Sequence, residues 1–246
     1  GSFQVFYEKT GTEKDAINDG HKMWISEVKF APDGQTFITG SLDKTAKIWC
    51  VTTCSNKTTL YGHTGHVTSV AYNKDGNKVV TGSADLTARE WDVKTGEMIR
   101  TCRGHSARIT SVAYAPNKDY MITGSEDKVC KLWNSKGCEI KSFTGHTSCI
   151  GTLAWSPNGN HIVTGSDDKT AKVWDIATGT EIMSLSGHHA RISSVAFSPD
   201  GLQVITGSND KTAKIWNVVT GNSTFNINGE RHKLTSIVYS PDGQYI

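Results

Sequence analysis

The stretch ITGSLDKTAKIW (residues 38–49) decides the fold, because the chain holds five near-copies of it. The tryptophans that end these copies lie 42, 42, 41 and 42 residues apart. The other copies are VTGSADLTAREW (80–91), ITGSEDKVCKLW (122–133), VTGSDDKTAKVW (163–174) and ITGSNDKTAKIW (205–216). A Gly-His pair recurs at the same period, with its histidine at positions 21, 63, 105, 146 and 188. Two sequence motifs that recur with the same period in five copies identify a structural repeat.

Each repeat predicts four short strands. A segment such as VTSVAY (67–72) follows the Gly-His pair and precedes a turn such as Pro-Asp-Gly (32–34), which suits a tight hairpin. A strand ending in Thr-Gly-Ser, an Asp-Lys-Thr turn, the tryptophan strand and a Lys-Thr-Gly turn (94–96) come before the fourth strand. A four-stranded unit cannot bury both faces alone, so it must stack on its neighbours. The sequence therefore predicts an all-β propeller of four-stranded blades.

The Gly-His and Trp-Asp marks at this spacing resemble the WD-repeat (WD40) β-propeller family over essentially the whole chain. That resemblance implies a buried tetrad of His, Thr, Asp and Trp in each blade. The four residue types can satisfy one another, since indole only donates, carboxylate only accepts, and hydroxyl and imidazole do both. An unsatisfied member would cost about 1–3 kcal/mol. The implied tetrads are His21, Thr39, Asp43 and Trp49; His63, Thr81, Asp85 and Trp91; His105, Thr123, Asp127 and Trp133; His146, Thr164, Asp168 and Trp174; and His188, Thr206, Asp210 and Trp216.

We expect residues 1–246 to form a single WD40 propeller domain. Its five complete repeats span about 20–61, 62–103, 104–144, 145–186 and 187–228. The flanking segments 1–19 and 229–246 each resemble half a repeat, with Phe6 in the place of tryptophan. Joined, they would make a sixth blade that lacks about six residues, including the Thr-Gly-Ser and Asp positions. The alternative is that the chain is part of a seven-bladed propeller.

Composition sets further limits. The chain has 26 basic and 24 acidic residues, a net charge of +2, which does not demand a nucleic acid partner. No apolar run reaches the roughly 20 residues of a membrane helix, so no membrane partner is expected. Six cysteines show no zinc-binding spacing and fit reduced thiols. These features favour an intracellular protein, cytoplasmic or nuclear.

The histidines do not favour an enzyme. Five belong to the implied tetrads, and His232 stands at the equivalent mark of the split blade. His66, His161 and His189 remain, and they lack partners at metal-ligand spacing. No phosphate-binding loop of the GxxxxGK type is present either. The sequence therefore predicts no catalytic residue, no metal and no cofactor.

Two aligned positions differ between successive repeats although their neighbours barely change. The first precedes the first strand, and the second precedes the tetrad aspartate. The family resemblance places both on the narrower propeller face, its usual contact surface. The alternative reading is that loop tips drift without constraint. The predicted partner-binding residues are Trp24, His66, Arg108, Arg191, Lys233, Glu126 and Asp167.

The predicted function is a non-catalytic scaffold that docks proteins or peptides on this face. One aromatic and several cations favour a partner with acidic groups beside an apolar anchor. Glu126 and Asp167 would repel phosphate, which disfavours nucleic acid. The alternative is a propeller module of a larger assembly with no activity of its own, and an enzyme is a weaker third hypothesis.

Glu90 is the exception among five aligned positions. The equivalents are apolar: Ile48, Leu132, Val173 and Ile215. A buried carboxylate needs a partner, so we expect a charge partner, a hydrogen-bond donor or local exposure at Glu90. If Glu90 is a tolerated substitution at a wet edge, Glu90→Leu should be neutral or stabilising.

Overall fold

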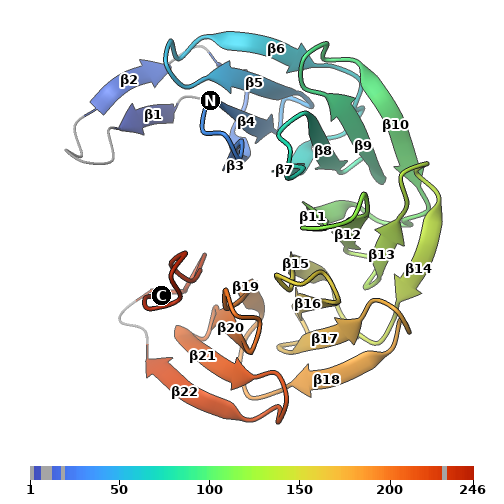
Figure 1. Ribbon diagram of the computed structural model, residues 1–246, viewed down its shortest axis with the longest axis vertical. Coiled ribbons are helices and arrows are strands. Elements are labelled where there is room, and N and C mark those ends of the chain that lie inside the picture. The colour runs from blue at the N-terminus through green and yellow to red at the C-terminus, as the bar shows by residue number, and fades with distance from the viewer. Residues whose placement is uncertain (1–2, 7–12, 18–19, 229–231) are drawn as a thin grey trace.

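The computed structural model describes residues 3–6, 13–17, 20–228 and 232–246. Every regular element in these ranges is a β-strand, and five four-stranded antiparallel sheets follow one another along the chain as blades around a centre (Figure 1). Within each blade, strands that are consecutive in sequence are also neighbours in the sheet. The predicted all-β architecture of four-stranded repeats is therefore confirmed.

The strands keep one order from the centre of the ring to its rim. The first blade contains β3 (Ile25–Phe30), β4 (Thr36–Ser41), β5 (Ala46–Cys50) and β6 (Asn56–Leu60). The next two contain β7 (Val67–Tyr72), β8 (Lys78–Ser83), β9 (Thr87–Asp92), β10 (Met98–Arg103), β11 (Ile109–Tyr114), β12 (Met121–Ser125), β13 (Cys130–Trp133) and β14 (Glu139–Phe143). The last two contain β15 (Ile150–Trp155), β16 (His161–Ser166), β17 (Ala171–Asp175), β18 (Glu181–Leu185), β19 (Ile192–Phe197), β20 (Gln203–Ser208), β21 (Thr212–Asn217) and β22 (Ser223–Asn228).

The core lies between blades. Trp91 of the second blade packs in one cluster with Ile38 of the first, and the pattern repeats around the ring. The glycine of each Thr-Gly-Ser allows the close approach, since a Cβ at Gly82 would lie 2.7 Å from Ile109 Cγ2 and 2.8 Å from Val112 Cγ1. The second strand of each blade thus packs directly on the first strand of the next.

The Asp-Lys-Thr turn has a defined geometry. Asp43 Oδ1 accepts hydrogen bonds from the Thr45 backbone N–H (3.0 Å) and hydroxyl (2.6 Å). These bonds hold Lys44 at a φ of 72°, in the left-handed region. Non-glycine residues seldom adopt this conformation, yet the same turn position does so in all five blades. The turn that carries the tetrad aspartate is therefore held by its own side chains.

The two ends of the chain lie on opposite sides of an opening in the ring (Figure 1). β1 (Phe3–Phe6) pairs with β2 (Glu13–Ile17), and Phe6 lies opposite Glu13 as Trp49 lies opposite Asn56. This register equals that between the third and fourth strands of the first blade. Residues 232–246 form no strand.

One sheet built from both termini is not found in the described residues. In each complete blade, the second strand pairs with both the first and the third. In the described residues, β1 and β2 pair only with each other, and residues 232–246 join no sheet. Closure into six blades therefore stays a prediction.

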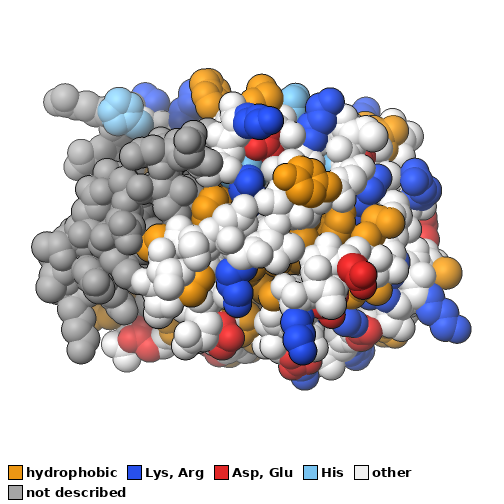
Figure 2. All heavy atoms as spheres, turned by 90° about the horizontal axis from the view of Figure 1, so that it is seen from above, with side chains coloured by type: hydrophobic (Ala, Val, Ile, Leu, Met, Phe, Trp, Pro, Cys, Tyr) orange, Lys and Arg blue, Asp and Glu red, His pale blue; other side chains and the backbone are white. Residues whose placement is uncertain are grey.

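The rim carries a mixed surface. Seen edge-on over β6 and β10, Lys and Arg side chains are spread among acidic and hydrophobic ones (Figure 2). The described residues include no helix long and apolar enough to span a lipid bilayer.

Candidate protein-binding face

The four residues of every implied tetrad are joined by hydrogen bonds. In the first blade, Trp49 Nε1 donates to Thr39 Oγ1 (2.8 Å), which lies 2.7 Å from His21 Nε2, and His21 Nδ1 lies 2.8 Å from Asp43 Oδ2. Because the carboxylate only accepts, Nδ1 carries the proton, and Nε2 accepts from the threonine hydroxyl. The other four blades repeat these contacts at 2.7–2.9 Å.

Burial and hydrogen bonding have opposite effects on the pKa values of the tetrad residues. Burial lowers the pKa of each tetrad histidine, against the opposing effect of the neighbouring aspartate, so the imidazole stays neutral. Burial acts to raise the pKa of Asp43, but hydrogen bonds from Thr45, His21 and backbone N–H groups outweigh it and lower that pKa to about 2. Asp85 and Asp168 behave alike.

The tetrads also anchor the loops of one face. Asp43 Oδ2 accepts the backbone N–H of Lys22 (3.0 Å), which ties the Gly-His loop to the turn before β5. Equivalent bonds occur in all five blades. The loops at this end of the blades are thus held by buried side chains rather than by the surface alone.

The two variable positions form pairs on this face. The backbone N–H of the residue before each tetrad aspartate donates to the carbonyl of the residue before the first strand, at 2.8–3.1 Å. The pairs are Leu42 with Trp24, Ala84 with His66, Glu126 with Arg108, Asp167 with Cys149, and Asn209 with Arg191. Two sets of residues that vary separately in the sequence are therefore neighbours in the structure.

Three of the predicted residues meet around one cavity. His66, Arg108 and Arg191 line a hollow of about 370 Å³, with Gly151 among the other lining residues. Arg108 Nε forms an ion pair with Glu126 Oε1 (2.7 Å). Asp167 and Arg191 line an adjoining hollow of about 210 Å³.

Besides Glu126, two predicted residues lie outside these hollows. Trp24 is 80% exposed, and Lys233 is also exposed. Neither lines the cavity that holds His66. The structure thus brings two arginines and a histidine together at one cavity, with Trp24 as a separate exposed aromatic.

Comparison with known proteins agrees with this architecture. A family profile described as "WD domain, G-beta repeat" matches residues 13–50, 54–92, 96–134, 137–175 and 179–217, which together make up most of the chain. The chain belongs to the WD40 family. Members of this family typically serve as scaffolds for protein interactions.

One curated relative resembles part of this WD40 chain. The small ribosomal subunit protein RACK1y of Oryza sativa subsp. japonica is 41% identical over 49 residues. The alignment covers 19% of this chain and 15% of that relative's length. The likeness therefore concerns about one repeat of the WD40 fold.

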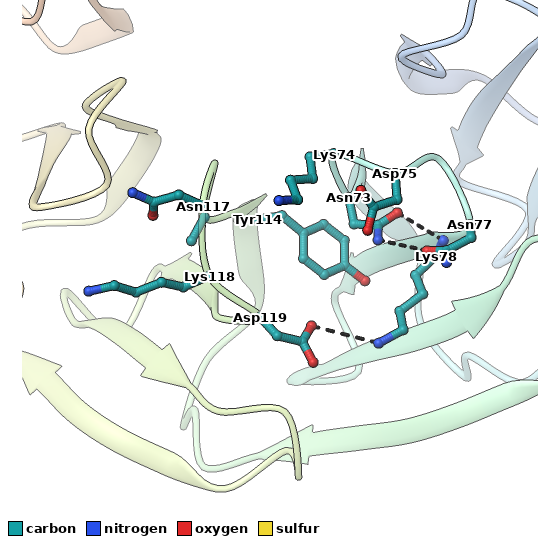
Figure 3. Close-up of a pocket in the computed structure, with 10 residues that line it drawn as sticks. Asn73, Lys74, Asp75, Asn77, Lys78, Tyr114, Asn117, Lys118 and Asp119 are labelled. Atoms are coloured by element: carbon teal, nitrogen blue, oxygen red, sulfur yellow. Dashed lines mark hydrogen bonds and ion pairs between the residues drawn. The ribbon is translucent and has the colours of Figure 1, made fainter.

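The opposite face of this WD40 ring holds a different pocket. It lies between the turns after β7 and β11, at the far ends of the strands that His66 and Arg108 precede, and it measures about 340 Å³. Figure 3 shows Lys74, Lys78 and Lys118 around it with Asp119, which pairs with Lys78 (3.6 Å). Acids and bases alternate here, so the pocket lacks the cationic bias of the narrower face.

Glu90 has the partners that a buried carboxylate requires. Its side chain is fully buried, Tyr114 Oη donates to Oε1 (2.8 Å), and the guanidinium of Arg100 lies against Oε2 as a close ion pair rather than an aligned hydrogen bond. Tyr114 belongs to the next blade, so the contact links two blades. Burial and the charge of Glu90 raise the pKa of Tyr114. The expectation of a partner is confirmed, and Glu90 does not lie at a solvent-exposed edge, because its side chain is fully buried.

Proposed function

We propose that this WD40 chain is a non-catalytic scaffold that docks a protein or peptide partner on its narrower face. The observation that carries the proposal is the cavity shared by His66, Arg108 and Arg191. These three residues come from three different blades, so one ligand placed in the cavity could touch all three. Trp24 adds an exposed aromatic on the same face, and aromatic and Arg side chains are typical anchors of protein interfaces.

Arg191 is the cation best placed to receive an acidic group. Arg108 already pairs with Glu126, whereas no acidic side chain among the described residues forms an ion pair with Arg191. A carboxylate of the partner would bind Arg191 without displacing an existing ion pair. The proposed partner therefore carries acidic groups near an apolar anchor, and its binding weakens as salt rises.

A pull-down from native lysate tests this function. The triple variant Trp24→Ala, Arg108→Glu, Arg191→Glu should lose the partners that the wild type recovers. None of these residues belongs to a tetrad, so melting should be unchanged. Replacing Trp24 alone should cost about 2 kcal/mol, roughly thirtyfold in affinity, if it is a main anchor.

The matched control reverses charge on the opposite face. Lys74→Glu with Lys118→Glu alters two exposed cations of the other pocket and should leave recovery as in wild type. If the narrower-face variant retains every partner, or if the control loses them equally, the proposed docking face is wrong.

A further inference from the structure

The second residue of each first strand faces the centre of the ring (Figure 1). In the five complete blades these residues are Ser26, Thr68, Thr110, Gly151 and Ser193, and all five line one central channel. Thr68 Oγ1 donates to the Ile109 carbonyl (2.6 Å), and Thr110 Oγ1 donates to the Ile150 carbonyl (2.5 Å). We call these five residues the collar. Gly151 is its only member without a hydroxyl.

Gly151 leaves a gap in the collar. Among the described residues, a Cβ there would meet only the Ile192 carbonyl oxygen, at 3.8 Å. That carbonyl occupies the place of the Ile109 and Ile150 carbonyls, which each accept a collar hydroxyl. The gap lies in the fourth blade, whose first strand packs between the first strands of two complete blades. Its surroundings are thus those of an interior blade.

The residue two positions before Gly151 is also small. At this position the third and fifth blades carry Arg108 and Arg191, whereas the fourth carries Cys149. Gly151 lines the His66 cavity, the adjoining hollow and the central channel, so all three spaces border this residue. We call the space over Gly151, between the two arginines, the notch. The fourth blade therefore presents two small residues where its neighbours present an arginine and a hydroxyl.

The charges inside the cavity that Gly151 borders are positive. No acidic residue is among those that line it, and Arg191 has no ion pair with an acidic side chain in the described residues. Two carboxylates lie outside the cavity: Glu126 pairs with Arg108 (2.7 Å), and Asp167 lines the adjoining hollow. A negative group placed over Gly151 would therefore lie between two arginines.

Cys149 adds no charge to the notch. Burial, followed by the carboxylates of Glu126 and Asp167, raises the pKa of this thiol above its ordinary value. The thiol therefore stays protonated at neutral pH. The walls of the notch are thus cationic, and the two small residues between them are uncharged.

We propose that the notch receives one acidic side chain, Asp or Glu, of the protein partner, and that Gly151 determines this specificity. The carboxylate would pair with Arg191, and the apolar stem would occupy the gap that a collar side chain fills in the other blades. A threonine at position 151, as in the collar of the second and third blades, would fill that space. The inference rests on the proposed docking face and specifies where the acidic group binds.

Short blocked peptides test the charge requirement on the full chain. Acetylated and amidated GGEGG carries a glutamate carboxylate as its only charge. It should shift the backbone amide of Gly151 saturably in amide NMR spectra, with a Kd of roughly 1–10 mM. The peptide GGQGG has nearly the same shape without the charge and should bind about tenfold more weakly or worse. Binding of GGEGG should also weaken as salt rises.

Gly151→Thr tests the size requirement. It restores the side chain found at Thr68 and Thr110 and should weaken GGEGG binding by about tenfold or more, measured from the shift of the Arg191 amide. Because the gap is open, Tm should be no lower than in wild type. A variant that folds as well and binds less would show that the space itself is needed.

Two further variants complete the comparison. Ser193→Thr is the matched control, since it enlarges the next collar side chain, which does not line the His66 cavity, and it should leave GGEGG binding unchanged. Arg191→Gln removes the proposed partner of the carboxylate. It should weaken GGEGG binding by about tenfold and leave GGQGG binding as it was.

Three results would overturn the inference. They are no shift at Gly151, equal affinity for GGEGG and GGQGG, and affinity that is unchanged by Gly151→Thr.

The lysate pull-down separates the notch from the docking face as a whole. If the triple variant loses its partners but Gly151→Thr keeps them, the docking face stands and the notch is wrong. If the triple variant keeps every partner, the docking face is wrong, and so is a role of the notch in binding them, even where GGEGG binds.

Discussion

Val70 and Val28 occupy the same place in their first strands, but their surroundings differ. Val70 is enclosed by the Thr-Gly-Ser strand of the preceding blade, whereas Val28 is 43% exposed beside the opening in the ring (Figure 1). The same apolar pattern thus yields a core position at one junction and a surface at another. Whether a first strand of this ring is buried therefore depends on the blade beside it and not on its own sequence.

Acid should lower the stability of the complete blades more than it changes residues 234–239. The folded state lowers the pKa of five histidines, so the unfolded chain binds protons first as pH falls below about 6.5, and stability declines. The tetrad aspartates, with pKa values held near 2 in three blades, add stability above about pH 4 that is lost as pH falls through 2.

Denaturant titration from pH 7.5 to pH 4 would measure this decline. Hydrogen exchange at residues 234–239, corrected for the intrinsic rate, should change less with pH than exchange in β16 or β20. Constant stability across that range would contradict the tetrad account.

Replacing each of the two valines with aspartate should give the largest difference in the free energy of unfolding between two single variants. Val70→Asp buries a charge without a partner and should destabilise by about 4 kcal/mol or unfold the second blade. Val28→Asp should cost under about 1 kcal/mol, because its side chain reaches solvent. Urea denaturation of both variants makes the comparison, and equal losses would show that β3 is covered in solution.

Glu90→Leu tests a junction held by polar contacts. Removing the carboxylate leaves Arg100 and Tyr114 without their partner, so we expect a loss of about 2–4 kcal/mol rather than the neutral effect expected from sequence. The double variant Glu90→Leu, Arg100→Leu should recover more than half of that loss in the same denaturation experiment. A single variant as stable as wild type would mean that the ion pair contributes nothing.

Gly151→Ser should have the smallest effect on stability, and it should stabilise the fold rather than destabilise it. Ser26, Thr68 and Thr110 each donate a hydroxyl to the first strand of the next blade, and Ser193 donates to the Leu234 carbonyl. Gly151 is the aligned position without a hydroxyl. A Cβ there would meet only Ile192 O, at 3.8 Å. The new hydroxyl should stabilise by about 0.5–1 kcal/mol, a rise in Tm of about 2–4 °C by calorimetry. A lower Tm would refute the proposed bond.

The repeat phrase predicted the blades, their strand order and the tetrad partners. It could do so because each residue of the phrase contacts another at a fixed offset: Thr81 is 10 residues from Trp91 and 18 from His63. Contacts between residues that do not recur at a fixed offset could not be predicted from the sequence. Arg100, the partner of Glu90, lies on the fourth strand, where the repeats share little sequence.

The candidate site was predictable only in part. Variation singled out Arg108 and Glu126, but nothing in the sequence showed that they form an ion pair and so leave Arg191 as the better acceptor. The left-handed turn residues were also missed, because Lys44 and Leu86 are not glycines. The sequence pattern that indicates this conformation is an Asp directly before the turn residue and a Thr directly after it, because the hydrogen bond between these side chains holds the turn.

The hydroxyl bridges between blades have a kinetic consequence. Each one joins a blade only to its neighbour, so stability passes along the ring as it does along a linear array of repeats. Among the five complete blades, the first and the fifth each contact one other complete blade, so unfolding should start at either of them. Substitutions that strengthen their contacts should therefore slow the unfolding rate more than they speed folding, because contacts at the last blades to dock form late.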